Sequence, residues 1–217
     1  MKKFLVAIVA VLFAAPSFAQ YSSGGFTLSE STVYYGARIG LNVSTLTGDE
    51  TGDAKAKAGM NLGGVVGLRI SDATPIFLES GLYFTMCGAK GKGKTEINLN
   101  YLEVPVLIKY GIQVTDDIAV LPYLGPTFRF GVGGNWKEDD GTGSTETKTS
   151  FKSERYSRPD VGMKIGCGVE YTKLYLEMGY QFGITNISDM TKPTTSGGKE
   201  EISQHNGAFF VNFGVNF

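Results

Sequence analysis

The chain has 217 residues, of which 42% are apolar, 12% aromatic and 19% charged, a composition that fits one sizeable folded domain. Twenty basic and 21 acidic residues give a net charge of −1, without the basic excess that binding to nucleic acid requires. One histidine and two cysteines exclude a zinc site built from several His and Cys ligands. The thirty glycines, spread along the whole chain, need a structural explanation.

Residues 1–19 have the pattern of a secretory signal peptide. Two lysines precede an apolar stretch over 4–15, and small residues lead to a predicted cleavage site after Ala19. A transmembrane anchor is disfavoured, because the apolar stretch is shorter than the roughly 20 residues of a membrane-spanning helix. Residues 20–32 are expected to form a short periplasmic lead-in to the folded part.

From residue 33 the chain alternates between apolar and polar residues with a period of two, which indicates β-strands with one apolar face. In the first segment Ile39 and Val43 lie on the apolar face, whereas Arg38 and Asn42 lie on the other. Residues 33–217 therefore predict a single all-β domain of eight strands. The segments with this pattern are 33–44, 60–70, 76–86, 100–112, 118–130, 158–171, 174–184 and 207–217.

The polar face of these segments carries all of their charged residues. No charge falls on the apolar face, whereas six basic and five acidic residues fall on the opposite face together with many of the glycines. These charges nearly cancel. They are Arg38, Arg69, Lys109, Arg129, Arg158 and Lys164, and Glu79, Glu103, Asp160, Glu170 and Glu177.

Two architectures share this alternation. In a soluble barrel of the lipocalin type the apolar face points inward, and glycine has no reason to gather on the face that meets water. In a membrane barrel the apolar face meets lipid, and glycine makes room for long charged side chains in a narrow interior. We therefore predict an eight-stranded antiparallel up-and-down transmembrane β-barrel, with the soluble barrel as the alternative.

The connections alternate in length, and this predicts the orientation in the membrane. Outer-membrane barrels have short periplasmic turns and longer extracellular loops, so both ends of this barrel are expected in the periplasm. Lipid-facing aromatic residues then fall into two girdles, one at each rim. The long connections are 45–59, 87–99, 131–157 and 185–206, and the short ones are 71–75, 113–117 and 172–173.

Charged residues inside a barrel need partners, because an unpaired buried charge costs several kcal/mol. The sequence therefore predicts an ion-pair network that closes the interior, and no sizeable pore. No catalytic residue, metal site or cofactor is expected. The predicted network comprises Arg38, Arg69, Glu79, Glu103, Lys109, Arg129, Lys164, Glu170 and Glu177.

Three features of the predicted loops have functional interpretations that plainer ones outweigh. Gly88–Thr95 fits the phosphate-binding pattern G-x-x-x-x-G-K-[ST], but no helix is expected after it, so we predict a Gly/Lys loop whose lysines can contact lipopolysaccharide phosphates. His205 near Ser203 is compatible with a surface hydrolase, but a solvated loop histidine is the better explanation. Trp136 is interpreted as a membrane-interface anchor in preference to the centre of a contact surface.

Two segments resemble a known family. Tyr35–Ser44, YGARIGLNVS, resembles the opening strand of the PorT-like outer-membrane β-barrel family of Bacteroidetes, and Asn100–Tyr110, NYLEVPVLIKY, resembles its central YLEIP-x-L-x-KY strand. The likeness extends from about Tyr34 to Phe217. It implies a small outer-membrane barrel, and PorT itself is implicated in a secretion system that exports proteases. No residue of this chain carries that role over.

Three functions follow as hypotheses. The first is a non-enzymatic outer-membrane barrel with surface-exposed loops, the second is an accessory component of a protein-export machine, and the third is a surface enzyme that uses His205. Phe213 and Phe217, at lipid-facing positions of the last segment, are predicted to form the C-terminal signal read by the barrel-assembly machinery. The other expected partners are outer-membrane lipid, lipopolysaccharide and a protein bound through the outer loops.

Overall fold

The computed structural model describes most of the chain from Val33 onward. The predicted signal peptide and the predicted lead-in lie outside the described residues. Within the described part every regular element is a strand, and no helix there is long and apolar enough to span a membrane. The described residues are 33–48, 55–71, 74–91, 96–139, 145–149, 151, 156–188, 191–193 and 199–217.

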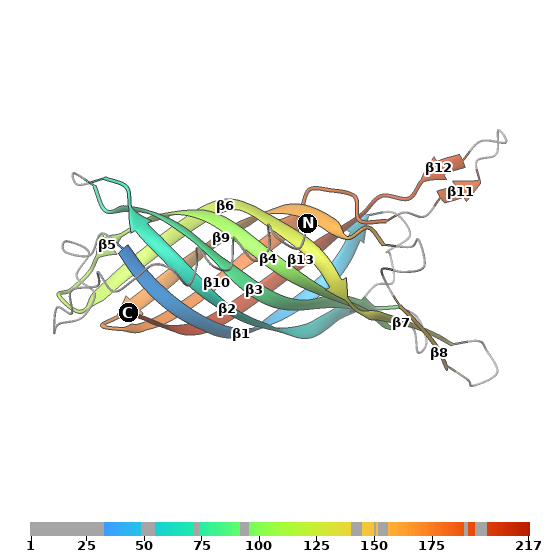
Figure 1. Cartoon of the computed structure of the whole chain (residues 1–217), viewed down its shortest axis with the longest axis horizontal. Helices are drawn as coiled ribbons and strands as arrows, with labels where there is room; N and C mark the ends of the chain where they lie inside the picture. The colour runs from blue at the N-terminus through green and yellow to red at the C-terminus, as the bar shows by residue number, and fades with distance from the viewer. Residues whose placement is uncertain are drawn as a thin grey trace, which may run out of the picture.

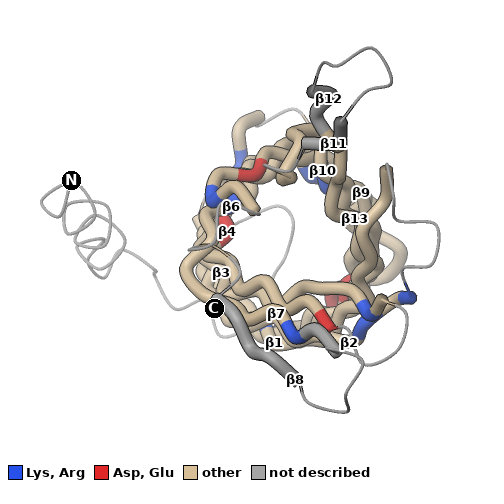
Figure 2. Tube along the Cα trace, turned by 90° about the vertical axis from the view of Figure 1, so that its right-hand side faces the viewer, with Lys and Arg blue, Asp and Glu red and all other residues tan. Residues whose placement is uncertain are grey.

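Eight long antiparallel strands close into a barrel (Figure 1). Each pairs with its neighbours in chain order, and pairing of the last with the first, from Gly36↔Asn216 to Gly48↔Gln204, closes the ring seen in Figure 2. The predicted eight-stranded antiparallel barrel is confirmed. The strands are β1 (Val33–Gly48), β2 (Lys55–Arg69), β3 (Ile76–Lys90), β4 (Glu96–Tyr110), β6 (Ile118–Gly133), β9 (Pro159–Tyr171), β10 (Leu174–Gly183) and β13 (Gln204–Asn216).

The two ends of the barrel differ. The short-turn end holds the first residue of β1, the C-terminus and the turns that follow β2, β4 and β9 (Figure 1). The long-loop end holds two small hairpins that extend away from the barrel (Figure 1). The remaining strands are β5 (Ile112–Gln113), β7 (Asn135–Asp139), β8 (Thr145–Thr149), β11 (Thr191–Pro193) and β12 (Lys199–Glu201).

At the long-loop end the strands continue beyond the predicted boundaries. β3 reaches Lys90 and β4 already begins at Glu96, so most of 87–99, predicted as a loop, is strand. The prediction was wrong here because it followed apolar residues on the outward face only. Beyond the lipid-facing band the polarity of the two faces inverts, with Leu46 and Leu99 buried inside and Lys90 exposed outside.

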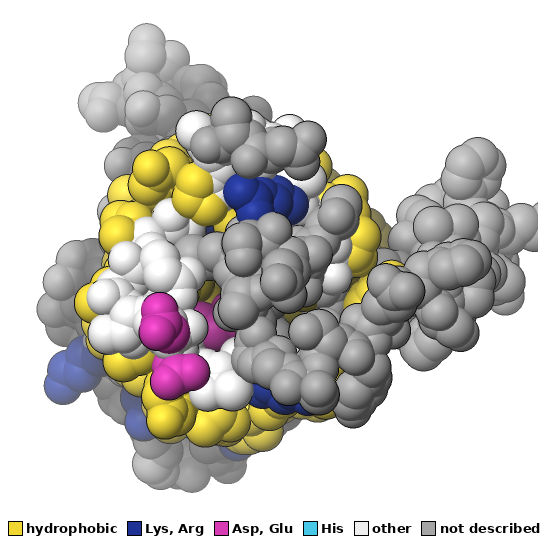
Figure 3. Space-filling view, turned by 90° about the vertical axis from the view of Figure 1, so that its left-hand side faces the viewer, with side chains coloured by type: hydrophobic (Ala, Val, Ile, Leu, Met, Phe, Trp, Pro, Cys, Tyr) yellow, Lys and Arg dark blue, Asp and Glu magenta, His cyan; other side chains and the backbone are white. Residues whose placement is uncertain are grey.

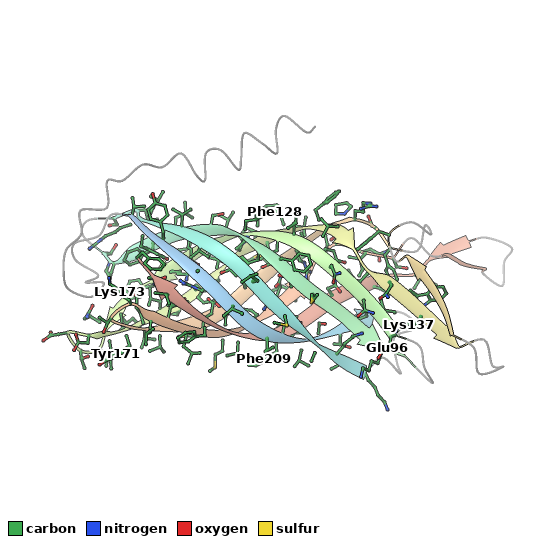
Figure 4. The ribbon with its side chains drawn as sticks, turned by 60° about the horizontal axis from the view of Figure 1, so that its bottom comes forward. Glu96, Phe128, Lys137, Tyr171, Lys173 and Phe209 are labelled. Carbon is green, nitrogen blue, oxygen red and sulfur yellow. The ribbon has the colours of Figure 1, made fainter. Side chains whose placement is uncertain are left out.

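The outer surface of the wall is apolar along most of its length. Phe128 and Phe209 project outward from the middle of the wall and Tyr171 from the short-turn end (Figure 4), and each is about half exposed. Figure 3 shows apolar side chains around the circumference at the short-turn end. Soluble monomers rarely expose so large an apolar surface, and with the charged residues inside it is the arrangement of a membrane barrel rather than of a lipocalin.

Glycine makes room for aromatic rings inside the barrel. A Cβ atom on Gly67 would lie 2.1 Å from the Tyr34 ring, and one on Gly168 would lie 2.1 Å from the Tyr175 hydroxyl. Such distances are far inside van der Waals contact, so no other residue fits under these rings without displacing them. The glycine-rich inward face is therefore explained by tyrosine packing as much as by the charged side chains.

Replacing Gly168 with valine tests this packing. Gly168→Val is expected to lower the free energy of unfolding by about 1–3 kcal/mol or more, because the fully buried Tyr175 ring has no space into which to move. Gly64→Val is the matched control, since a Cβ there meets only one atom, at 3.8 Å, on the exposed outer wall. Urea unfolding in lipid vesicles measures both variants. Equal stabilities would contradict the packing argument.

Candidate functional site

The buried charged residues of the barrel interior fall into two groups by their contacts. The short-turn group consists of Arg38, Glu79, Lys109, Glu170 and Glu177. The long-loop group consists of Glu103, Arg129, Asp160 and Lys164. All nine side chains are buried inside the ring of strands, which Figure 2 shows end-on.

Glu79 is the centre of the short-turn group. Its Oε2 atom accepts a hydrogen bond from the Tyr34 hydroxyl at 2.6 Å and lies 2.8 Å from Nζ of Lys109. Nη2 of Arg38 is 3.9 Å from the same oxygen. One carboxylate thus balances two cations, and its side chain is 1% exposed. A charge so placed is stabilised only while its partners remain.

Tyr175 joins the two cations of this group from the other side. The guanidinium carbon of Arg38 lies 4.1 Å from the centroid of the Tyr175 ring, within cation–π distance. Nζ of Lys109 donates a hydrogen bond to the Tyr175 hydroxyl at 2.8 Å. Ring and carboxylate therefore hold Arg38 and Lys109 between them, and the lumen is filled at this level.

The long-loop group contains two ion pairs. Nζ of Lys164 lies 2.5 Å from Oε1 of Glu103, whose other oxygen accepts a hydrogen bond from the Gln181 amide at 3.0 Å. Nη2 of Arg129 lies 2.7 Å from Oδ2 of Asp160, a close ion pair without an aligned N–H···O hydrogen bond. The sequence predicted all four residues on the inward face but left Asp160 out of the ion-pair network, and it did not predict which residues pair.

Two carboxylates of the short-turn group have amide partners instead of cations. Oε2 of Glu170 accepts a hydrogen bond from Nδ2 of Asn216 at 2.9 Å, and Oε1 of Glu177 accepts one from Nδ2 of Asn212 at 2.7 Å. Among the described residues no cationic nitrogen lies within 4.0 Å of either. In the described part of the chain the interior therefore holds four buried basic and five buried acidic side chains, with one acidic side chain in excess in the short-turn group.

Arg69 and Arg158, both of inward parity, lie outside the two groups. Nε of Arg69 donates a hydrogen bond to the carbonyl oxygen of Ser71 at 2.9 Å, at the short-turn rim. Nη1 of Arg158 donates one to the carbonyl oxygen of Gly131 at 2.9 Å, at the other end. The structure thus does not bring Arg69 to the other residues of the predicted network, because β2 ends there and its side chain reaches the turn.

Polar residues without charge, which sequence reasoning passed over, repair a break in the wall. The β2–β3 register shifts between Ala56 and Asn61. There, Nδ2 of Asn42 donates to the carbonyl oxygen of Met86 at 2.9 Å, and the Gly88 amide donates to Oγ of Ser44 at 2.8 Å. Side chains of β1 thus satisfy backbone groups of β3 that have lost their ladder partners. In the sequence, the position of Asn42 and Ser44 on the inward face was the only indication of this role.

An apolar cluster closes the interior at the long-loop end. The Phe151 ring packs edge-on against Tyr101, with centroids 5.7 Å apart, so a residue of a predicted outer loop is part of the core. Trp136 is 6% exposed and paired with Ile97, so its interpretation as a membrane-interface anchor was wrong. The buried members are Leu46, Cys87, Ala89, Leu99, Tyr101, Phe151, Tyr156 and Ile187.

His205 and Ser203 are in contact at the start of β13. Nε2 of His205 lies 3.1 Å from Oγ of Ser203, and Nδ1 lies 2.9 Å from the carbonyl oxygen of Thr185. Ser203 directly precedes β13, and residues two apart in an extended chain point to the same side, so this contact follows from the local chain geometry. A nucleophile site also needs donors aimed at an oxyanion, and the pair alone does not supply them.

The two phenylalanines of the predicted C-terminal signal lie on the outer wall. Phe213 is 49% and Phe217 69% exposed. The backbone of Phe217 exchanges hydrogen bonds of 2.7 and 3.1 Å with Tyr35, which places the chain end at the short-turn rim beside β1. Both aromatic rings are therefore available to lipid or to a protein that guides insertion.

An apolar outer wall, a charge-filled lumen and unequal ends together define an outer-membrane β-barrel protein. The chain belongs to the family described as the outer membrane protein beta-barrel domain, whose model matches residues 18–189. This membership places the protein in the outer membrane. No curated protein sequence matches the chain.

Three solved bacterial outer-membrane proteins are among the structures similar to this chain. Ail, the attachment invasion locus protein of Yersinia pestis, is 12% identical with a TM-score of 0.45, and the match covers 86% of this chain and 100% of that one. Neisserial surface protein A is 18% identical with a TM-score of 0.45 and coverage of 86% and 98%. OprG of Pseudomonas aeruginosa is 14% identical with a TM-score of 0.46 and coverage of 86% and 96%.

The different partners of Glu79 and Glu170 predict a large loss of stability for one variant and almost no change for the other. Glu79→Gln is expected to lower the free energy of unfolding by about 3–5 kcal/mol, because it leaves Arg38 and Lys109 without their carboxylate. Glu170→Gln removes an acidic side chain that has no cationic partner and keeps an acceptor for Asn216, so it is expected to change stability by less than about 1 kcal/mol. Urea unfolding in vesicles at neutral pH measures both. A larger loss of unfolding free energy for Glu170→Gln than for Glu79→Gln would refute the assignment of Glu79 as the centre of the short-turn group.

The apolar cluster predicts how far the longest loop can be shortened. Replacing residues 140–149 with a short Gly/Ser linker is expected to leave the barrel folded, because the replacement removes no residue of the apolar cluster. A folded barrel has a different gel mobility before boiling than after it, and this difference should persist.

Phe151→Ala is expected to lower the free energy of unfolding by about 2–4 kcal/mol, because it leaves a cavity in the apolar cluster. If Phe151→Ala is as stable as the wild type, the ring does not contribute to the core.

Proposed function

We propose that this protein is a non-enzymatic outer-membrane barrel with a closed, ion-paired interior, which acts through its rims and surface-exposed loops in envelope or surface contacts. The observation that carries this proposal is the filled lumen. Arg38, Glu79 and Lys109 meet inside the barrel with exposed fractions of 1% or less in their side chains. Side chains without access to water cannot line an aqueous channel, so the contacts of this protein with other molecules are made outside the lumen.

We propose partners for the outer wall, for the long-loop end and for the C-terminal strand of the barrel. Outer-membrane lipid covers the apolar exterior, and lipopolysaccharide meets the long-loop end. The barrel-assembly machinery reads the C-terminal signal formed by Phe213 and Phe217, whose exposure on the outer wall supports this role. A protein partner that binds the outer loops is the remaining member of this set.

An accessory role in protein export is the second candidate function. It is favoured by the likeness of Tyr35–Ser44 and Asn100–Tyr110 to the PorT-like family. Such a component would act through its periplasmic rim. Deleting the gene and assaying exported proteins distinguishes the two candidates, because a simple surface barrel leaves export unchanged.

Reconstitution in planar bilayers tests the closed interior. Single wild-type barrels are expected to give no stable large conductance steps, because both groups of ion pairs would have to separate to open a path. A wide-pore porin in the same lipid serves as the control for insertion. Uniform, long-lived steps from the wild-type protein would overturn the proposed function.

A further inference from the structure

A row of charged residues crosses four neighbouring strands at the long-loop end. Lys55 of β2 is paired directly with Lys90 of β3, Lys90 with Glu96 of β4, and Glu96 with Lys137 of β7. Directly paired residues of antiparallel strands point to the same face of a sheet. We call these four residues the lysine row. Lys57 of β2, which is paired with the buried Ser44 and is 17% exposed, lies beside the row and reaches its Glu96.

The lysine row lies on the outward face of the wall. The residues next to it in sequence, Ala89 and Trp136, are buried in the interior, so Lys90 and Lys137 point away from it. The Lys90 side chain is 52% exposed. Figure 4 shows Glu96 and Lys137 at the end of the barrel opposite to Lys173. The row is therefore open to whatever surrounds the wall at this height.

The row has a charge that its own carboxylate does not balance. Glu96 is shared by Nζ of Lys57 at 3.4 Å and by Nζ of Lys90 at 3.9 Å. Among the described residues no acidic side chain forms an ion pair with Lys55, although like charges directly opposite each other on a sheet are destabilising. Together with Lys57, the row has four lysines and one glutamate, which leaves three positive charges side by side. An anion bound between them would relieve the repulsion.

The height of the row matches the headgroup layer of the membrane. The last exposed apolar residue of β3, Met86, precedes Lys90 by four residues, roughly 13 Å along the strand and about 10 Å along the axis of a tilted barrel. Lysine side chains at this distance from the apolar band reach the polar groups of the lipids. The row therefore lies at the edge of the lipid-facing wall and not at the tips of the loops.

We infer that the lysine row binds phosphate groups on the headgroup of an anionic glycolipid in the outer leaflet. This inference rests on the proposed function, in which the long-loop end of the barrel faces outward. Lysine recognises phosphate as a point charge and tolerates varied geometry, which suits headgroups that differ in their sugars. A soluble polyanion is the less favoured occupant, because the row faces sideways along the wall, where lipid lies.

Lipid A with two phosphates, presented in phosphatidylcholine nanodiscs that contain the full-length mature protein, is the probe. The apparent affinity for this lipid is measured by displacement at low salt, with dephosphorylated lipid A as the reference. The double variant K55Q/K90Q is expected to bind phosphorylated lipid A about 25-fold more weakly, from roughly fivefold for each lysine near a charged membrane surface. The wild type should discriminate between the two lipids, and high salt should reduce that discrimination.

Two matched variants give the test its direction. Lys173→Gln at the short-turn end removes an exposed lysine outside the row and is expected to leave the affinity unchanged. Glu96→Gln removes the one acidic residue of the row and is expected to tighten binding severalfold. An unboiled gel shift and urea unfolding verify that each variant is folded. Weaker binding by Glu96→Gln, or an equal loss in Lys173→Gln, would overturn the site.

Competition with soluble anions separates the sources of phosphate. If inorganic phosphate or heparin displaces lipid A fully at low concentration, or if K55Q/K90Q loses heparin binding but retains lipid A, the lipid assignment is overturned. Wild-type-like binding of lipid A by K55Q/K90Q overturns it as well and leaves the closed interior untouched. A large conductance in planar bilayers overturns the proposed function and leaves the lysine row as it is, so the two failures are distinguishable.

Discussion

The ion pairs around Glu79 depend on one constraint, the narrow interior of an eight-stranded barrel whose outer face is given to lipid. Charged residues that cannot face lipid must point inward, and there they lose water. Each must then find a partner, because an isolated buried charge is far too costly. Tyr34 and Tyr175 complete the contacts of Glu79, Lys109 and Arg38, and these rings fit only because the facing wall positions are glycine. The glycine content, the tyrosines and the charge pattern are therefore consequences of a single packing problem.

The polarity of the wall changes along each strand, and this explains where sequence reasoning failed. Within the membrane the apolar face of a strand points outward, so outward periodicity located eight strands and the correct face for every one of the nine interior charges. Above the membrane water returns to the outside, and the apolar face must turn inward, as in any soluble sheet. Leu46, Ala89 and Leu99 follow this second rule while Lys90 faces out. A search for one uniform alternation ends each strand at the point of inversion, although the backbone ladder continues.

Alternation alone also could not predict the contacts within the interior. Pairing of Lys109 with Glu79 and of Lys164 with Glu103 depends on the stagger between strands, and the sequence contains no direct record of that stagger. Arg69 has inward parity, but it is the last residue of β2 and lies at the short-turn rim, so its side chain donates a hydrogen bond to the carbonyl oxygen of Ser71. Asn42 and Ser44 matter because β2 shifts register beside them, and a bulge of that kind has no sequence signature here. The number of strands and the inward or outward face of each residue were predictable, because both follow from local alternation. The pairing of side chains was not predictable, because it depends on how the strands are staggered in the closed barrel.

A charged interior is not the most stable solution, because well-packed apolar residues often equal or exceed a buried ion pair in stability. It nevertheless solves a problem that precedes folding. If the interior positions of β4 or β6 were apolar like the exterior ones, each strand would be a continuous apolar run, and two such runs joined by a short turn would exceed the length of a membrane-spanning helix. Export across the inner membrane would then compete with insertion into it. Glu103, Lys109 and Arg129 interrupt these runs at inward positions. On this argument the charged residues are needed for export, and in the folded barrel ion pairing allows them to be buried in a dry interior.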